Sequence, residues 1–308
     1  MTYSTGTRRS ERLPSWLRRT IPLLPDSSRI EGAVRRNDLH TICREGLCPN
    51  RAECYAKGKV TFMMLGDVCT RGCRFCSVSK GTPAPADPGE PARIAAAASE
   101  LGLSHVIVTS VTRDDLPDGG AAAFASVTRE LLDLDPAPVV EVLVPDFGGS
   151  SEALDTVLEA EPDVFAHNVE TVGRLYPSVR SGADYGRSLG LLAAARRRSP
   201  EVRTKSALML GLGETTDEVL GALADLRGAD VDFVALGQYL RPGLDQVPVR
   251  EYIPPAAFDE LARQARDMGF LEVTAGPLVR SSYQENTVPA RSARTGARSA
   301  QRCEEDVR

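Results

Sequence analysis

The sequence predicts an α/β fold built on a parallel sheet. From residue 61 onward, short β-branched segments alternate with longer helical segments, which is the pattern of successive βαβ units. Six such units precede a last short strand, and six are too few to close an eight-stranded barrel. A loop with three cysteines follows directly on the first strand. Because ligands bind beyond the carboxyl ends of parallel strands, we expect this loop at the mouth of the fold.

The expected strands are short and apolar. The first is apolar enough to be a buried strand, and the second, "HVIVTSV", is strongly β-branched. The six strands cover residues 61–65, 105–111, 139–144, 164–169, 205–210 and 231–236, and residues 271–274 form a last short strand.

The expected helices follow these strands in turn. The first is Ala-rich and has Pro91 near its first turn, where proline is tolerated. The helices cover residues 91–101, 120–132, 151–160, 184–198, 216–227 and 255–268, and a further helix over residues 29–38 precedes the sheet. Polar residues 1–12 are expected to be disordered.

Composition excludes several classes of protein. The chain has 308 residues, of which 42% are hydrophobic, and this suits one large domain or a core with short extensions. It lacks the run of about 18 apolar residues that a membrane helix needs, and its Arg-rich N-terminus lacks the apolar stretch of a secretory signal. The formal net charge of -5 gives no electrostatic reason to bind nucleic acid.

Cysteine usage indicates metal thiolates. Six of the seven cysteines lie between Cys43 and Cys76, a crowding that favours metal ligands in a reducing cytoplasm over a disulfide framework. The seventh, Cys303, is predicted to be a free thiol in a polar tail.

Three cysteines, Cys69, Cys73 and Cys76, have the spacing C-x3-C-x2-C. Three thiolates hold three corners of a [4Fe-4S] cube and leave one iron open, whereas electron-carrying ferredoxin clusters have four cysteines. The alternatives are a structural zinc site, which usually takes four ligands with C-x2-C pairs, or buried thiols. The spacing resembles that of the radical S-adenosylmethionine (SAM) enzymes. In these, the open iron chelates SAM, and an electron from the cluster cleaves it to a 5'-deoxyadenosyl radical.

A second triplet, Cys43, Cys48 and Cys54, lies just upstream with the spacing C-x4-C-x5-C. This spacing matches no general zinc-finger or ferredoxin rule. Its position favours a second Fe-S cluster, and the alternative is three structural cysteines.

The two triplets together resemble the paired signature of the lipoyl synthase family. The stretches "TFMMLGDVCTRGCRFC", "VTSVTRDDLPDGGA", "TKSALMLGLGET", "GQYLRP" and "GPLVRSSY" agree as well, so that the likeness runs from about residue 13 to residue 283. It implies a partial (β/α)6 TIM-type barrel of the radical SAM class over residues 59–277. An N-terminal extension, residues 1–58, would carry an auxiliary-cluster motif. A C-terminal segment, residues 278–308, would carry the R-S-S-Y motif and a polar tail.

The resemblance also implies the ligands. The triplet at Cys69 would bind the SAM-cleaving cluster, and the triplet at Cys43 an auxiliary [4Fe-4S] cluster whose fourth ligand is a serine of R-S-S-Y. We place that ligand at Ser282, with Ser281 as an alternative that the sequence does not separate. Closing the chain between Cys54 and Ser282 costs roughly 5 kcal/mol of chain entropy, which the folded barrel must offset.

Polar residues follow the fourth expected strand. Alternation places Asn168 and Glu170 on one face, where they are predicted to hydrogen-bond the amino group or ribose of SAM. The alternative is that they cap a helix. Lys205 and Arg187 either meet carboxylates of a ligand or form structural ion pairs. Turn chemistry accounts for most of residues 114–119.

The three histidines, His40, His105 and His167, show no metal-ligand spacing and are predicted to be structural.

The implied reaction is the insertion of two sulfur atoms at C6 and C8 of a protein-bound octanoyl group, with the auxiliary cluster as sulfur donor. Acid–base groups of ordinary pKa do not break an unactivated C–H bond, so no catalytic residue is expected beyond the cluster ligands. The implied partners are an octanoylated lipoyl carrier domain (dehydrogenase E2 or glycine cleavage H protein) and an electron donor such as ferredoxin or flavodoxin. The alternatives are a non-catalytic Fe-S or zinc-binding protein, or another radical SAM sulfur-inserting enzyme.

Overall fold

The computed structural model describes residues 13–18 and 27–283. Over these residues the chain forms an eight-stranded sheet in the order β1-β2-β5-β6-β7-β8-β9-β10. Every neighbouring pair is parallel except β1 and β2, which are antiparallel. The strands are β1 (His40–Thr41), β2 (Thr61–Met64), β5 (His105–Ser110), β6 (Val139–Leu143), β7 (Val164–Ala166), β8 (Arg203–Leu210), β9 (Phe233–Gln238) and β10 (Glu272–Gly276).

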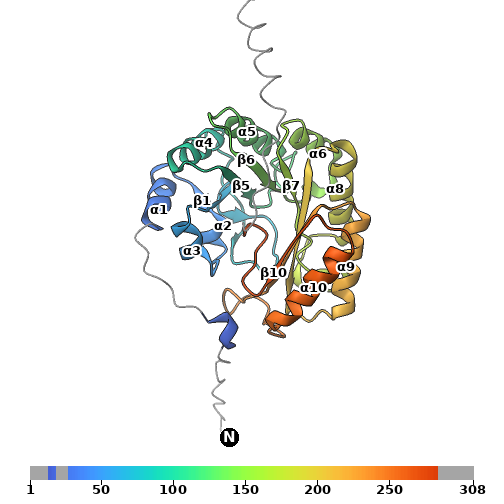
Figure 1. Ribbon diagram of the computed structural model, residues 1–308. Coiled ribbons are helices and arrows are strands. Elements are labelled where there is room, and N and C mark those ends of the chain that lie inside the picture. Colours follow the sequence, from blue (N-terminus) through green and yellow to red (C-terminus); the bar gives the residue numbers. More distant parts are fainter. Residues whose placement is uncertain (1–12, 19–26, 284–308) are drawn as a thin grey trace, which may run out of the picture.

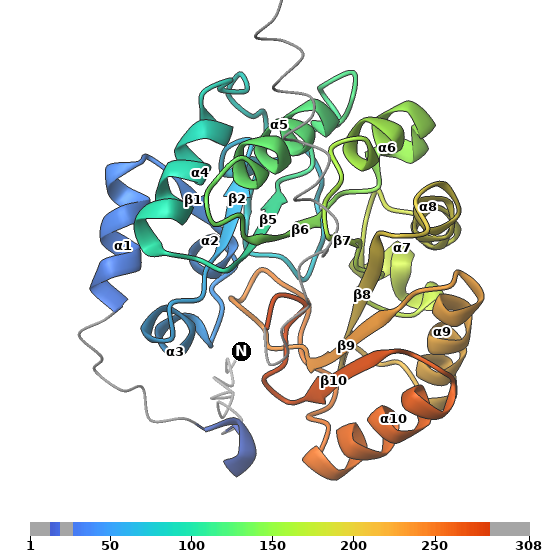
Figure 2. The ribbon, with the colours of Figure 1, turned by 45° about the horizontal axis from the view of Figure 1, so that its top comes forward.

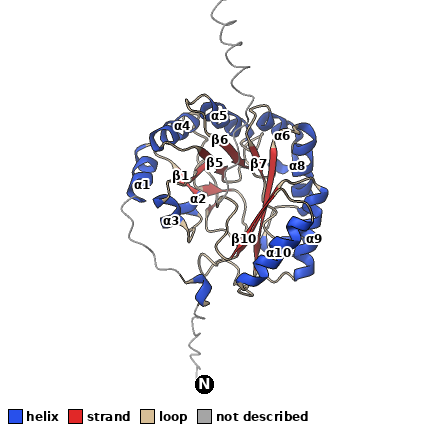
Figure 3. Cartoon of the chain, in the orientation of Figure 1, coloured by secondary structure: helices blue, strands red, loops and turns tan. Residues whose placement is uncertain are grey.

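The longer helices lie outside the strands, as Figure 3 shows with helices in blue and strands in red. They are α4 (Glu90–Leu101), α5 (Ala121–Leu132), α6 (Ser151–Leu158), α8 (Tyr185–Arg198), α9 (Thr216–Gly228) and α10 (Pro255–Asp267). Local sequence fixes several of their ends. Gly102 ends α4 in the left-handed conformation, with φ 64°, and Thr215 with Glu218 forms a capping box at the start of α9.

The predicted fold class is confirmed. Each of the six predicted strands and the last short one is present, and the helices expected after the six strands are present as well. The sheet curves in an arc from α1 and β1 at one end to β10 and α10 at the other (Figures 1 and 2). Because β1 and β10 are edge strands that do not pair with each other, the sheet stays open over the described residues.

Small elements near the cysteines were not predicted. They are α2 (Ile42–Glu45), α3 (Arg51–Ala56), α7 (Tyr176–Val179) and the two-stranded pair of β3 (Val68–Cys69) with β4 (Ser79–Lys80), together with β1. Their lengths of two to six residues explain the omission, because periodicity needs a longer window. Strand β7 ends at Ala166 rather than at residue 169.

The helix expected at 29–38 is α1 (Ser27–Arg36). It lies with α2 and α3 beside β1 (Figure 1). The Thr41 and Tyr55 hydroxyls, from β1 and α3, lie 2.7 Å apart inside this part of the chain. The expectations for residues 1–12 and for Cys303 fall outside the described residues.

The core lies between the sheet and the outer helices. Phe62 of β2, Phe165 of β7 and Phe124 of α5 are fully buried. Burying a side chain of this size contributes about 1.5–3 kcal/mol, so the sheet is a stable platform for the loops at its carboxyl end. No helix among the described residues is long and apolar enough to cross a membrane.

Candidate functional site

A cavity of about 490 Å³ opens at the carboxyl ends of the strands. Alternate, inward-facing strand residues form its apolar wall, among them Met63, Thr109, Leu143, Ala207 and Met209. The cysteine loop after β2 forms part of its rim, as expected for a parallel sheet. The cavity is therefore apolar inside and polar at its mouth.

Cys69, Cys73 and Cys76 all line this cavity. The β3–β4 pair closes the base of their loop, since Cys69 belongs to β3 and pairs with Lys80. The backbone N–H of Arg74 donates to Val179 O at 2.8 Å, which ties the loop to the end of α7. The structure thus brings the three predicted ligands to one side of one cavity.

Burial favours the protonated form of two of these thiols, Cys73 and Cys76. Desolvation raises the pKa of Cys76 to about 11 and also raises the pKa of Cys73, although the nearby Arg180 cation opposes the latter shift. Metal binding needs the thiolate, so uptake of iron at this site would release the protons of Cys73 and Cys76.

The second triplet lies on the short helices α2 and α3. Cys43 is in α2, Cys54 is in α3, and Cys48 lies in the turn between them. Together with Ser282 they line a small pocket of about 20 Å³. Burial is the largest cause that raises the pKa of Cys43 to about 11 and of Cys54 to about 12. Metal binding at this triplet would therefore also release the protons of Cys43 and Cys54.

The C-terminal R-S-S-Y motif reaches this pocket across the sheet. Asn50, between Cys48 and Cys54, donates from Nδ2 to Leu278 O at 2.6 Å and fastens the segment before the motif. The residue just before the motif passes close to β9 at Gly237, where a Cβ atom would lie 2.0 Å from Val279 O. Only glycine at this position allows the two backbones to approach so closely.

The two serines of the motif face different neighbours. Ser282 lines both the small pocket of the Cys43 triplet and the larger cavity, whereas Ser281 lines only the larger one. The Ser281 hydroxyl accepts a hydrogen bond from Asn168 Nδ2 at 3.1 Å. Of the two, only Ser282 is directed to the second triplet.

Asn168 and Glu170 line the cavity together, just beyond the end of β7. Asn168 Nδ2 also donates to Glu170 Oε1 at 3.1 Å. Both protons of the amide are thereby engaged, and the buried Oδ1 has no hydrogen-bond partner among the described residues. A buried acceptor of this kind fits a ligand that brings a donor.

Glu170 has an unusual backbone. Its φ of 66° lies in the left-handed region, which is uncommon for a residue other than glycine. Two hydrogen bonds to β8 hold it there, from Glu170 N–H to Ala207 O at 2.9 Å and from Met209 N–H to Glu170 O at 2.8 Å. Burial raises the pKa of its carboxyl, while the Arg180 cation and Asn168 lower it. Strain held in this way is typical of functional positions.

Sequence reasoning missed Arg180. It lines the cavity, and its Nη1 donates to the Tyr176 hydroxyl at 2.8 Å and to Ser188 Oγ at 3.1 Å. No motif marks this residue, because the tyrosine and serine that orient it come from α7 and α8 and meet it only in the folded chain.

Lys205 and Arg187, by contrast, form structural ion pairs. Lys205 Nζ lies 2.8 Å from Glu141 Oε1, and Arg187 Nε lies 2.8 Å from Asp146 Oδ2. Neither Lys205 nor Arg187 lines the cavity.

The histidines are structural as predicted. His167 is buried between Val144 O at 2.8 Å and Ser188 Oγ at 3.0 Å, and burial lowers its pKa to about 3, so that it is neutral. His105 lies 3.3 Å from Glu141, and His40 lies 3.8 Å from Glu45.

The donor sets fit iron–sulfur clusters by their chemistry. Within the part of the chain that the structure describes, no three His, Cys, Asp or Glu side chains are close enough to share a single metal ion. A cubane cluster instead takes each thiolate on a separate iron. The site formed by Cys69, Cys73 and Cys76 also has room for a ligand beside it, because it opens into the cavity of about 490 Å³.

Comparison with known proteins agrees with this chemistry. The family model of the radical SAM superfamily matches residues 63–226. Lipoyl synthase of Methylococcus capsulatus is 54% identical over 273 residues, which cover 88% of this chain and 85% of the relative. The chain belongs to the lipoyl synthase family. It is therefore a radical SAM enzyme, and this implies the use of SAM and a [4Fe-4S] cluster.

Other lipoyl synthases match over similar lengths. Lipoyl synthase 2 of Parasynechococcus marenigrum is 51% identical and covers 89% of this chain and 96% of the relative. Lipoyl synthase of Thermus thermophilus is 49% identical, and the match covers 89% of this chain and 86% of the relative. The resemblance seen in the cysteine motifs thus extends over 88–89% of this chain.

Solved structures support the fold at low sequence identity. HydG, a maturase of the [FeFe]-hydrogenase, superposes with a TM-score of 0.52 at 13% identity, covering 82% of this chain and 68% of that one. Streptococcus suis SuiB bound to precursor peptide SuiA superposes with a TM-score of 0.54 at 11% identity, covering 70% of this chain and 48% of that one. These similarities concern the lipoyl synthase fold, a partial barrel, and not its substrate.

Proposed function

We propose that the chain inserts two sulfur atoms, at C6 and C8, into an octanoyl group attached to a lipoyl carrier protein domain, giving lipoyl-lysine. The observation that carries this proposal is the approach of the two triplets. Cys69, Cys73 and Cys76 line the same cavity as Cys43 and Cys48, together with Ser282. A substrate chain in this cavity therefore meets both sites.

Two [4Fe-4S] clusters are part of the proposal. Cys69, Cys73 and Cys76 would hold the cluster that binds SAM, and Cys43, Cys48 and Cys54 the auxiliary cluster, with Ser282 as its fourth ligand. When bound, these groups supply reductive cleavage of SAM and sulfide for transfer. A serine oxygen binds iron more weakly than a thiolate does, which suits a cluster that gives up sulfur.

Residues beside the first cluster site would hold SAM. Asn168 Oδ1, the unpartnered buried acceptor, suits the amino group or ribose of SAM. The Glu170 carboxylate next to it offers a second acceptor. Arg180 places a cation on the same cavity wall, where a ligand carboxylate needs one.

The apolar wall would receive the octanoyl chain. Met63, Leu143 and Met209 line it, and burying each methylene of the substrate contributes about 0.8 kcal/mol. The wall also excludes water from the reacting carbons, so reactive species do not meet competing hydrogen donors.

The partners follow from this chemistry. The substrate would arrive on a dehydrogenase E2 lipoyl domain or a glycine cleavage H protein, and a ferredoxin or flavodoxin would supply electrons. Free thiol ligands favour a reducing compartment, so we place the enzyme in the cytoplasm. We assign auxiliary-cluster binding to residues 1–58 and 278–308, and the barrel to residues 59–277.

Direct assay tests the proposed reaction. Reconstituted protein, SAM, a reductant and an octanoylated carrier peptide are incubated without oxygen, and the peptide is analysed by mass spectrometry. We expect the mass of two added sulfur atoms at the octanoyl-lysine, with deoxyadenosine formed in parallel. Deoxyadenosine without any sulfur-containing peptide would instead point to another radical SAM reaction.

Ser282 provides a specific prediction. Ser282→Ala should still cleave SAM, because the first triplet is unchanged, but it should yield much less lipoyl product per auxiliary cluster. Ser282→Cys should form the cluster and yet yield sulfur poorly, because a thiolate holds iron more firmly than the serine oxygen. Product and cluster content are measured together for each variant.

Ser281→Ala is the matched control. It removes the hydroxyl that accepts from Asn168 but leaves the second triplet complete, so its loss of sulfur insertion should be smaller. Wild-type yield from Ser282→Ala would rule out a ligand role. A loss confined to Ser281→Ala would transfer that role to Ser281.

A further inference from the structure

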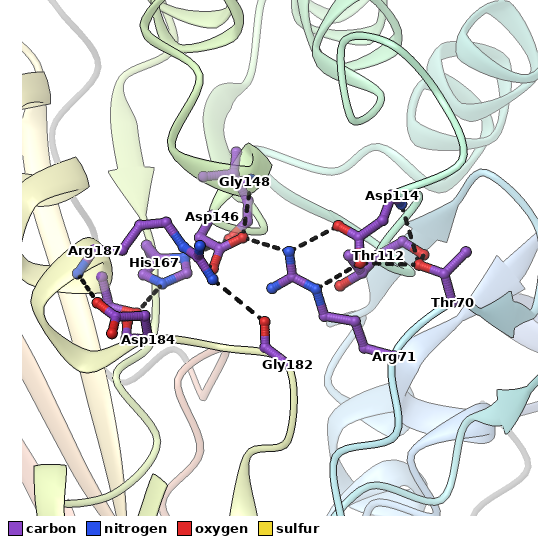
Figure 4. A network of polar contacts seen from close by, with 12 residues as sticks. Thr70, Arg71, Thr112, Asp114, Asp146, Gly148, His167, Gly182, Asp184 and Arg187 are labelled. Atoms are coloured by element: carbon purple, nitrogen blue, oxygen red, sulfur yellow. Dashed lines mark hydrogen bonds and ion pairs between the residues drawn. The ribbon is translucent and has the colours of Figure 1, made fainter. Parts of the chain in front are cut away.

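Arg71, in the loop of the first cysteine triplet, is held on two sides by carboxylates (Figure 4). Its Nε donates to Asp114 Oδ2 and its Nη2 to Asp114 Oδ1, both at 2.7 Å. The same Nη2 lies 2.7 Å from Asp146 Oδ1. Only 10% of the Arg71 side chain is exposed, so solvent screens these pairs little.

Asp146 is a fully buried carboxylate that joins two arginines. Besides Arg71 it accepts from Arg187 Nε at 2.8 Å and from the Gly148 N–H at 3.1 Å. The two carboxylates and two guanidinium groups balance in charge. Loss of Arg71 alone would therefore leave Asp146 paired with Arg187, and the buried carboxylate would not become isolated.

The network joins the cysteine loop to three separate elements. Asp114 follows β5, Asp146 follows β6, and Gly182 precedes α8. A Cβ atom on Gly182 would lie 3.5 Å from Arg71 Cδ, so this turn packs on the aliphatic part of the arginine. Arg187 Nη2 donates to Gly182 O at 3.3 Å and fastens the turn in place.

A second set of contacts runs beside the first (Figure 4). Thr70 donates to Thr112 O from its N–H at 3.1 Å and from Oγ1 at 2.9 Å. The Asp114 N–H donates back to Thr70 Oγ1 at 3.1 Å. The carboxylate that holds Arg71 is thus itself oriented by the residue before Arg71.

Arg71 also contacts a proposed ligand directly. Its backbone N–H donates to Cys69 Sγ at 3.4 Å, and the residue lies between Cys69 and Cys73 in the chain. Movement of the Arg71 backbone would therefore move both sulfur atoms and alter this N–H···S contact. Hydrogen bonds to the sulfur ligands are among the factors that set a cluster's reduction potential.

The shape of the side chain matters as well as its charge. Arginine presents a planar fork that binds one carboxylate with two parallel hydrogen bonds and still has donors for a second. Lysine is a point charge on a flexible stem, so it cannot hold both carboxylates in the same arrangement.

We propose that Arg71 is a positioning residue: its fork, clasped by Asp114 and Asp146, sets the orientation of the loop that presents the open iron to SAM. This inference rests on the proposed assignment of Cys69, Cys73 and Cys76 to the SAM-cleaving cluster. It goes beyond that assignment because Arg71 is not a metal ligand, and although the residue lines the cavity, its guanidinium is engaged by Asp114 and Asp146.

The first test uses protein without clusters. Amide hydrogen exchange of residues 69–76 is compared in wild type, Arg71→Lys, Arg71→Gln and Asp114→Asn. We expect faster exchange in all three variants. Arg263→Lys, in an exposed ion-pair cluster on α10, is the control and should leave this loop unchanged. Unaltered exchange in the Arg71 and Asp114 variants would overturn the proposal, whether or not the clusters are assigned correctly.

The second test uses reconstituted protein. We expect wild-type iron and sulfide content in Arg71→Lys, a smaller change in the reduced cluster's electron paramagnetic resonance spectrum when SAM is added, and slower deoxyadenosine formation. The rate per cluster should fall about tenfold or more, since a displacement of about 1 Å can cost about a hundredfold.

The two tests separate the possible failures. A wild-type spectrum and rate in Arg71→Lys would show that charge alone suffices and would overturn the role of the fork. Loss of the cluster itself from Arg71→Lys and Asp114→Asn would assign Arg71 to cluster assembly and would also overturn positioning. If wild-type protein neither held iron nor cleaved SAM, the cluster assignment would fail, while the exchange experiment would still report on the loop.

Discussion

Replacing Cys69, Cys73 and Cys76 together by alanine is expected to abolish SAM cleavage. In the proposed assignment these thiolates hold the cluster at the cavity rim, so without them no iron is presented to SAM. The wild type should hold about eight irons per chain and the variant about four, because the second triplet is untouched. Iron and sulfide analysis measures the cluster content, and chromatographic detection of deoxyadenosine measures SAM cleavage.

Cys303→Ala is the control for this variant, because it removes a thiol that belongs to neither triplet. It should retain wild-type iron content and rate. Stoichiometric zinc without iron in the wild type would contradict the assignment, and so would undiminished deoxyadenosine from the triple variant.

Replacing Cys43, Cys48 and Cys54 together by alanine is expected to abolish sulfur insertion and to leave SAM cleavage. In the proposed function the radical is generated at the other triplet, and that site keeps its ligands. The auxiliary cluster is the proposed source of sulfur, so its loss leaves nothing to insert. Peptide mass spectrometry and deoxyadenosine formation, measured on the same sample, separate the two steps.

A matched pair of variants strengthens this test. The two triple variants have equal numbers of alanine substitutions, yet only the one at Cys69 should lose deoxyadenosine. Lipoyl product from the Cys43, Cys48 and Cys54 variant would show that the sulfur comes from elsewhere.

Much of the fold could be predicted because its signals are local. The alternation of apolar strands and longer helices predicted the parallel sheet, and the cysteine loop does lie at its carboxyl end. The small elements α2, α3 and α7 were missed. They have too few residues for a periodic pattern, and contacts with the barrel hold them in place.

The site was predicted less completely. Asn168 and Glu170 were expected on one face and do line the cavity together, although β7 ends before them. Turn chemistry described only part of residues 114–119. Asp118 does accept from the Gly120 and Ala122 N–H groups at 2.9 and 2.8 Å, but Asp114 binds Arg71, which no turn rule predicts.

The sequence by itself determined the βα order, the two cysteine triplets and the family that they resemble, because spacing along the chain carries all three. Only the tertiary structure decided which serine faces the second triplet, that Arg180 lines the cavity and what holds Arg71. These depend on contacts such as Asn50 with Leu278, 228 residues apart, and Arg71 with Asp114, 43 residues apart. Packing of the sheet brings such segments together, and no local pattern records which side chains then meet.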